Sequence, residues 1–232
     1  MDYDDLVMMR SSNNSTGQAG VPRDFFLSCK TGPEVETKVK GSRFVGQAFR
    51  VDDLAAVETF LVGIRKKYYD ATHHCTAYRL GSPDTSTEKS DDNGEPSGSA
   101  GVPILGAIHR ANRYDCFIIV TRYYGGTKLG TGGLVRAYGE AARFAVEKAP
   151  ERVIWHEIEL TLRCSYDSLG AVEAVLGREA TRLRGVERVF EATPEFRVRV
   201  ARSFGTGLED ILVEATAGKI EIIGREERQD DS

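Results

Sequence analysis

The residues with the clearest potential for chemistry are cations placed around a glycine-rich segment. Arg122 precedes residues 125–133, Lys128 lies within that segment, and Arg136 follows it. Glycines leave backbone N–H groups unshielded by side chains, and a helix that begins after them adds partial positive charge. The pattern predicts an anion site. Its candidate contacts are Arg122, Tyr123, Gly125, Gly126, Lys128, Gly132, Gly133 and Arg136.

The segments that flank the glycines have the patterns of a buried strand and a helix. Residues 116–121 (CFIIVT) are apolar and rich in β-branched side chains, which favours a strand buried on both faces. Apolar residues then recur at helical spacing from Leu134 to Ala145, and Pro150 ends the run. The loop between them matches neither the P-loop motif nor the dinucleotide-binding glycine motif. The glycines alone therefore identify no ligand class.

Two adjacent histidines, His73 and His74, lie where a strand over residues 74–80 is expected to begin. Neighbouring strand residues point to opposite faces, so adjacency does not let His74 and Cys75 act together. The histidines have no Cys or His neighbours at the spacing of metal ligands. We interpret His74 as a hydrogen-bonding residue at the strand end, with a metal ligand as the alternative.

A polar, acidic loop over residues 81–93 leads into a second group of candidate residues. Asp92 and Glu95 belong to the segment SDDNGEP at residues 90–96. Paired carboxylates can bind Mg²⁺ or transfer protons, but they can also cap a helix. We favour capping of a short helix over residues 102–111, and we expect no metal and no other cofactor. Arg136 has an alternative role as the ion-pair partner of Asp92 or Glu95.

Charge is distributed unevenly along the chain. The 232 residues have a formal net charge of −4 and a pI near 5.7. Residues 81–100 carry five acidic side chains against one basic one, whereas residues 101–150 carry seven basic against three acidic. Four cysteines without a CxxC pair indicate reduced thiols rather than a disulfide scaffold. The sequence contains neither a signal-peptide pattern nor an apolar run of membrane-spanning length, so we expect a cytoplasmic protein with no membrane partner.

The periodicity predicts two domains between two tails. Strands within residues 35–51, a helix capped by Asp52, and the segments above make up the first half. The second half has the order βαββαβ of a ferredoxin-like unit. Its elements are predicted at residues 154–164, 166–183, 186–191, 195–201, 208–217 and 220–223. The predicted boundaries are a disordered tail at 1–22, domains at 23–150 and 151–224, and a charged tail at 225–232.

Three segments resemble the IMPACT/YigZ family, and the bacterial YigZ branch is the closer likeness. They are YYDATHHCTAYRLG, SDDNGEPSGSAG and VTRYYGGTKLGTGGLVRAYG, and the resemblance covers roughly residues 36–224. It implies an α+β fold with a ribosomal protein S5 domain 2-like α/β domain followed by the ferredoxin-like domain. The family reads SDDGEP where this chain has the additional Asn93, which leaves open whether Asp91 or Asp92 takes the family position.

The resemblance implies three interpretations of function, in the following order of preference. The first is an RNA- or ribosome-binding module that regulates translation, with the three cations on phosphates and Tyr123 or Tyr124 stacking on a base. The second is a protein-interaction regulator, as eukaryotic IMPACT proteins are, although the partner of those proteins is engaged through an additional RWD domain not found in this sequence. The third is an enzyme or binder for a phosphorylated small molecule. We expect no enzyme, because no activated nucleophile is visible.

Overall fold

The computed structural model describes residues 24–231 in two compact units. Residues 26–153 form the N-terminal unit, and residues 154–231 with Asp24 and Phe25 form the C-terminal unit. The mixed α+β class predicted from the sequence is confirmed. The tail predicted at residues 1–22 lies outside the described residues. No helix within residues 24–231 is long and apolar enough to cross a membrane.

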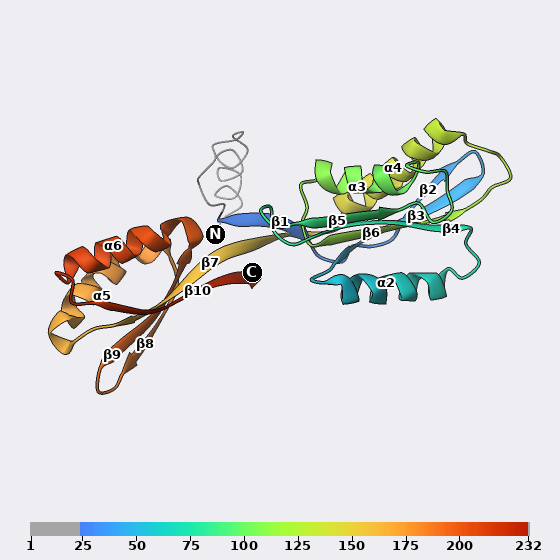
Figure 1. Ribbon diagram of the computed structural model, residues 1–232. Helices are drawn as coiled ribbons and strands as arrows, with labels where there is room; N and C mark the ends of the chain where they lie inside the picture. The colour runs from blue at the N-terminus through green and yellow to red at the C-terminus, as the bar shows by residue number, and fades with distance from the viewer. Residues whose placement is uncertain (1–23, 232) are drawn as a thin grey trace. The chain divides into compact units, whose positions relative to one another are not determined.

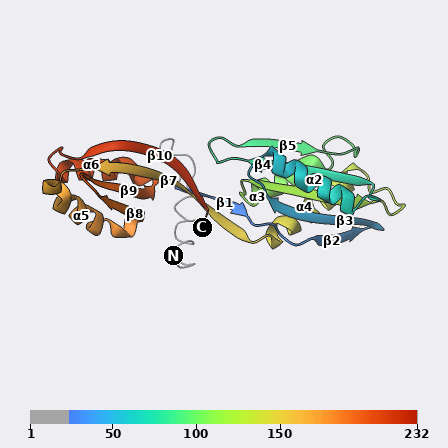
Figure 2. The same ribbon diagram turned by 90° about the horizontal axis from the view of Figure 1, so that it is seen from below.

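The N-terminal unit is an antiparallel sheet with helices on both faces (Figures 1 and 2). The strand order is β2 (Val35–Val39), β3 (Ser42–Arg50), β6 (Cys116–Tyr123), β4 (His73–Leu80) and β5 (Thr87–Asp91). Helices α3 (Gly101–Arg110) and α4 (Thr131–Lys148) cover one face, and α2 (Leu54–Lys67) covers the other. A short strand that the sequence analysis missed, β1 (Phe25–Cys29), precedes them.

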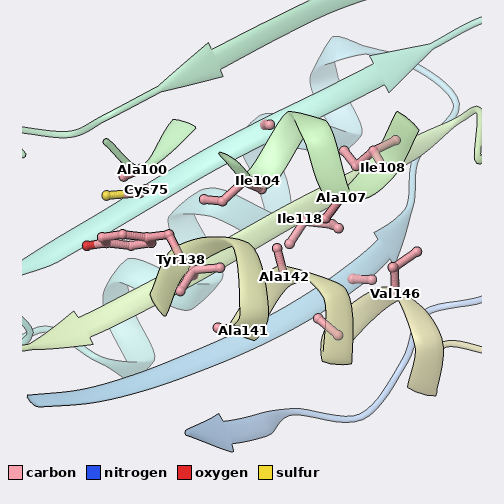
Figure 3. Packing of buried hydrophobic residues seen from close by; sticks show 14 of the residues in the cluster. Cys75, Ala100, Ile104, Ala107, Ile108, Ile118, Tyr138, Ala141, Ala142 and Val146 are labelled. Carbon is pink, nitrogen blue, oxygen red and sulfur yellow. The ribbon is translucent and has the colours of Figure 1, made fainter. Parts of the chain in front are cut away.

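Strand β6 lies at the centre of this sheet and explains the apolar run that precedes the glycines. Ile118 and Val120 pack towards α3 and α4, together with the fully buried Tyr138 (Figure 3). Phe117 and Ile119 belong to the separate cluster under α2. Because side chains alternate along a strand, both sets had to be apolar. The strand continues two residues beyond the predicted end, so Arg122 and Tyr123 are held by sheet hydrogen bonds.

Two local predictions for the N-terminal unit were wrong. The predicted acidic loop contains strand β5, which pairs with β4 from Thr76↔Asp91 to Leu80↔Thr87. An exposed edge strand needs no apolar alternation, and the TEKSD sequence therefore resembles a loop. The N-cap of α2 is Asp53, whose Oδ1 accepts the Ala56 N–H at 2.7 Å, whereas Asp52 accepts a hydrogen bond from Arg50.

The C-terminal unit is a second antiparallel sheet with two helices on one face (Figure 1). Strands lie side by side in the order β10 (Glu221–Asp231), β7 (Glu151–Arg163), β9 (Pro194–Ala201) and β8 (Leu183–Phe190). The helices are α5 (Leu169–Arg178) and α6 (Gly205–Ala215). The single helix predicted at residues 166–183 is interrupted, because one-turn 3₁₀ segments, Tyr166–Ser168 and Ala180–Arg182, flank α5.

Residues 225–231, for which the sequence predicted a charged tail, belong instead to strand β10, which continues to Asp231. Its backbone pairs with β7 from Glu221↔Arg163 to Asp231↔Ile154. Charged strand residues find charged partners: Arg225 Nη1 lies 2.9 Å from Glu209 Oε1, and Arg228 Nη2 lies 3.0 Å from Glu159 Oε1. The sequence analysis missed the end of this strand because its residues lack apolar alternation.

Candidate functional site

The glycine segment begins with a close backbone approach between two loops of the N-terminal unit. A Cβ on Gly125 would lie 1.9 Å from the carbonyl carbon of Gly41, inside the turn between β2 and β3. The Gly125 N–H donates to the buried Ser42 Oγ at 3.2 Å. This amide is therefore occupied within the fold, and Gly125 serves packing rather than the anion contact that the sequence predicted.

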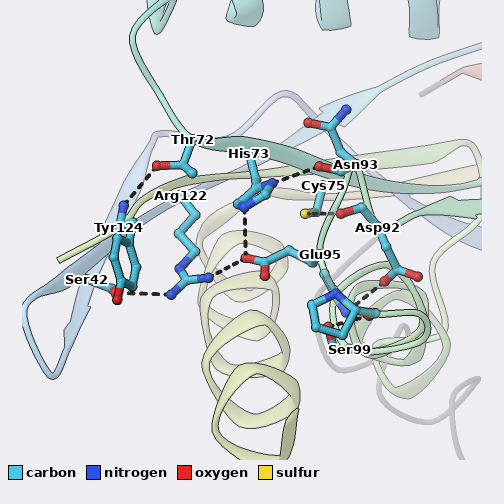
Figure 4. A network of polar contacts seen from close by, with 12 residues as sticks. Ser42, Thr72, His73, Cys75, Asp92, Asn93, Glu95, Ser99, Arg122 and Tyr124 are labelled. Carbon is cyan, nitrogen blue, oxygen red and sulfur yellow. Dashed lines mark hydrogen bonds and ion pairs between the residues drawn. The ribbon is translucent and has the colours of Figure 1, made fainter. Parts of the chain in front are cut away.

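Arg122 is not an exposed phosphate contact, contrary to the expectation from the sequence. Its side chain is 6% exposed, and its Nη1 lies 2.5 Å from Oε1 of Glu95, whose side chain is 4% exposed (Figure 4). Its Nη2 donates to Ser42 Oγ at 3.3 Å. A buried guanidinium paired in this way cannot neutralise a phosphate without losing its carboxylate partner.

Polar side chains from three elements of the N-terminal unit approach Glu95. Besides Arg122 on β6, the hydroxyl of Tyr138 on α4 donates to Glu95 Oε1 at 2.8 Å. Nε2 of His73 on β4 lies 3.8 Å from the same oxygen. Burial raises the pKa of Tyr138 well above its ordinary value, and Cys75 and Glu95 add to this shift, so its hydroxyl acts as a donor. Glu95 therefore joins the acidic segment to the strand and helix that flank the glycines.

The two histidines have different roles because they lie on opposite faces of β4. His73 stands opposite Arg122 in the sheet, and its Nδ1–H donates to the Asn93 carbonyl at 2.8 Å. His74 stands opposite Thr121, and its Nδ1 lies 3.2 Å from Thr121 Oγ1. Burial, followed by the charge of Arg65, lowers the pKa of His74. The hydrogen-bonding role expected for His74 agrees with this geometry, but the histidine beside Glu95 is His73.

Asp92 caps helix α3, as the sequence analysis favoured. Its Oδ1 accepts the N–H groups of Ala100 and Gly101 at 2.9 and 2.8 Å, and its Oδ2 accepts that of Gly98 at 2.7 Å. Burial alone would raise the pKa of this carboxyl, but the three backbone hydrogen bonds outweigh it and lower the pKa. Among the residues that the structure describes, the Asp91 side chain accepts one N–H, that of Asn93, whereas Asp92 accepts three.

Among the charged and aromatic side chains of residues 122–136, three are exposed. They are Tyr124, which follows β6, Lys128 in the glycine loop, and Arg136 in the second turn of α4. The expected alternative for Arg136, an ion pair with Asp92 or Glu95, is not formed. The N-cap of α4 is Gly130, which has no side chain with which to accept the first N–H groups of the helix.

The glycines of the candidate site divide into two kinds. Gly125 and Gly133 are packed, since a Cβ on Gly133 would lie 3.1 Å from Leu129 Cβ. Gly126 and Gly132 face open space: no heavy atom of the described residues, beyond those next to each glycine, lies within 4 Å of an added Cβ. Gly126 also has φ +83°, which favours glycine.

The sequence analysis missed Ser42, His73 and Tyr138 as parts of this arrangement. It placed Tyr123 among the candidate contacts and left Tyr123 and Tyr124 as alternatives for base stacking. The hydroxyl of Tyr123 donates to Asp70 Oδ1 at 2.8 Å, and the Arg43 guanidinium lies 4.6 Å from its ring centroid. Ser42 and Tyr138 carried no local signal, because a serine in a turn and a tyrosine in a helical stripe are common.

Comparison with known proteins places the chain in a family. A family model, the Impact N-terminal domain, matches residues 40–146. The IMPACT family member YigZ of Escherichia coli (strain K12) is 38% identical over 145 residues, which are 62% of this chain and 71% of the relative. The IMPACT family member YvyE of Bacillus subtilis (strain 168) is 32% identical over 199 residues, 85% of this chain and 89% of the relative.

A solved structure is similar over most of the chain. The crystal structure of a hypothetical protein is 30% identical, with a TM-score of 0.60, and the match covers 88% of this chain and 99% of that one. Sequence similarity to YvyE extends over both units, and the two named relatives are matched over more than two thirds of their lengths. This chain belongs to the IMPACT family.

Proposed function

We propose that this chain binds RNA, free or in the ribosome, through the surface formed by Gly126, Lys128, Gly132 and Arg136, and that binding serves the regulation of translation. The translational setting comes from the family resemblance. The RNA-binding surface comes from the geometry of the N-terminal unit. Catalysis is not part of the proposal.

The observation that carries the proposal is the position of the two exposed cations. Along the chain, Lys128 precedes the start of α4 and Arg136 follows it, and both side chains are exposed. The cap residue Gly130 has no side chain. The first-turn N–H groups of a helix carry partial positive charge and accept anions. Gly126 and Gly132 leave open space beside this helix start. Phosphate groups match this combination of charge and access.

The sheet topologies support the fold analogies from which the RNA expectation arose. In the C-terminal unit, the element order β7-α5-β8-β9-α6-β10 and the strand order β10-β7-β9-β8 agree with a ferredoxin-like domain. We infer that the N-terminal unit is ribosomal protein S5 domain 2-like. Fold analogy raises the expectation of RNA contact but does not establish it.

The test is RNA binding as a function of salt concentration. A fluorescent single-stranded oligoribonucleotide is titrated with wild type, with Lys128→Ala and with Arg136→Ala. Each lost phosphate contact should weaken binding by roughly five-fold, corresponding to about 1 kcal/mol, and should reduce the salt slope by about 0.7. Melting temperatures should stay close to that of wild type, because both side chains are exposed.

Lys148→Ala provides a matched control on the same helix. Lys148 is exposed in the last turn of α4, twelve residues from Arg136 and therefore about 18 Å along the helix axis. This variant should bind RNA as wild type does. If all three variants bind RNA as tightly as wild type does, this surface does not contribute to binding and the proposal fails. If Arg136→Ala instead loses stability while binding per folded molecule is unchanged, Arg136 belongs to the scaffold.

A further inference from the structure

We infer that the nucleic acid bound at this surface is single-stranded and that one of its bases stacks on the ring of Tyr124. This inference rests on the RNA binding proposed above and adds the class of strand and the residue that recognises it. The sequence left two tyrosines as candidates at this position. The structure separates them.

The Tyr123 ring is more enclosed than the Tyr124 ring. The guanidinium carbon of Arg43, which stands opposite Tyr123 in the sheet, lies 4.6 Å from the Tyr123 ring centroid. The ring of Tyr68 lies nearly perpendicular to the same ring, at a centroid distance of 6.5 Å. Tyr124 points away from this group, and 46% of its surface is exposed. An exposed aromatic side chain in the same segment as two exposed cations, Lys128 and Arg136, matches the composition of a single-strand binding surface.

Two contacts position Tyr124: one holds its backbone, and the other lies against its ring. Its backbone N–H donates to Thr72 Oγ1 at 3.0 Å. The guanidinium carbon of Arg122 lies 5.5 Å from its ring centroid, and Figure 4 shows the two side chains next to each other. Arg122 is itself fixed by Glu95 and Ser42. A ring fixed in this way loses little freedom when a base stacks on it, which favours binding.

The residues that follow Tyr124 leave room for a nucleic-acid strand and supply a cation for its phosphates. Gly126 has open space where a side chain would be, and Lys128 is exposed two residues later. The bases of a duplex are stacked inside it and cannot reach an aromatic ring, whereas the bases of a single strand can. Because every base has a flat face, stacking on one ring tolerates many sequences.

The experiment compares three polyanions with the same number of phosphates per strand: a single-stranded oligoribonucleotide, its duplex, and an abasic single strand. Wild type should bind the strand with bases at least about five-fold more tightly than the abasic strand. Tyr124→Ala should abolish this preference while leaving abasic binding unchanged. Tyr124→Phe, which keeps the ring, should retain the preference. Tyr166→Ala, at an exposed tyrosine of the C-terminal unit, should behave as wild type.

The outcomes separate this inference from the proposed function. If Tyr124→Ala keeps the preference for bases, or if wild type binds the abasic strand and the duplex as well as the single strand, stacking on Tyr124 is overturned while phosphate binding stands. If wild type binds none of the three polyanions, both the RNA-binding proposal and this inference are wrong. Melting temperatures of both Tyr124 variants confirm that folded protein is compared.

Discussion

Glu95 Oε1 lies 2.5 Å from Arg122 Nη1, and both side chains are almost completely buried. Glu95 belongs to the acidic segment that leads into α3, whereas Arg122 belongs to the strand that leads into the glycine loop. The pair therefore joins two segments that the sequence separates by 27 positions. Ser42 accepts hydrogen bonds from both Arg122 and Gly125. The Glu95–Arg122 ion pair is therefore also connected to the start of the glycine loop.

Removal of Glu95 should be strongly destabilising. Glu95→Ala leaves the Arg122 guanidinium and the Tyr138 hydroxyl buried without their acceptor, which should lower the free energy of unfolding by about 3–5 kcal/mol. Urea unfolding measures this change. The control is Glu147→Ala, which breaks an exposed ion pair to Arg143 and should cost less than about 1 kcal/mol. Equal losses in the two variants would contradict a structural role for the buried pair.

Asp92→Asn should change the dependence of stability on pH. The folded-state pKa of Asp92 is lowered below its ordinary value of 3.8, so its contribution is fully present above that value. The contribution is lost as the pH falls through the folded-state pKa. At neutral pH the variant should be less stable by about 0.5–2 kcal/mol, because one amide oxygen cannot accept all three N–H groups. The difference between wild type and variant should shrink in acid.

Asp91→Asn is the matched control for that measurement. Asp91 is exposed and accepts a single N–H, from Asn93. Unfolding of both variants by urea, at neutral pH and again below pH 3.8, provides the comparison. A larger loss in Asp91→Asn than in Asp92→Asn would mean that the wrong aspartate has been assigned to the cap of α3.

Alanine substitutions should separate the packed glycines from the open ones. In Gly125→Ala the new Cβ would overlap the Gly41 backbone, so we expect a loss of more than about 2 kcal/mol in the free energy of unfolding. Gly132 lies in the first turn of α4 with open space around it, so Gly132→Ala should be neutral or stabilising by up to about 1 kcal/mol. Thermal unfolding monitored by circular dichroism tests both. Similar melting temperatures for the two variants would contradict the close approach of Gly125 to Gly41.

The last strand should be detectable by hydrogen exchange. Because β10 pairs with β7 through residues 225–231, alternate backbone amides of this segment should exchange slowly. Fast exchange at every amide from residue 225 onward would show instead that the chain ends as a tail. Deleting residues 225–232 should lower the stability of the C-terminal unit, since it removes most of one strand and the Arg225–Glu209 pair.

The four cysteines should resist alkylation in the native protein. All four are buried thiols, and burial raises the pKa of Cys75 to about 12. The thiolate is the reactive form, so Cys75 should react very slowly at neutral pH. Thiol counting should detect four reactive groups only after denaturation. Fewer than four would indicate a disulfide or a bound metal.

Local sequence patterns were sufficient to predict most elements of both units. The apolar run of β6 and the helical stripe of α4 are strong signals, because burial on one or two faces requires apolar residues at a fixed period. Charged strands at sheet edges, β5 and the end of β10, were missed because exposure imposes no such period. Capping of α3 by a carboxylate of the acidic segment was predicted. The sequence could not indicate that Asp92, nine residues before Gly101, would accept the N–H groups while Glu95 pairs with Arg122.

The sequence by itself determined that cations, glycines and tyrosines lie together near residues 122–136, and that the chain belongs with proteins of the same motifs. Only the tertiary structure decided which of them face solvent. Strand register sets this outcome, because His73 stands opposite Arg122 and Arg43 stands opposite Tyr123. In this register Arg122 is buried against Glu95, Arg43 lies over the Tyr123 ring, and Tyr124 remains exposed. Register depends on contacts between distant segments, which no local pattern contains.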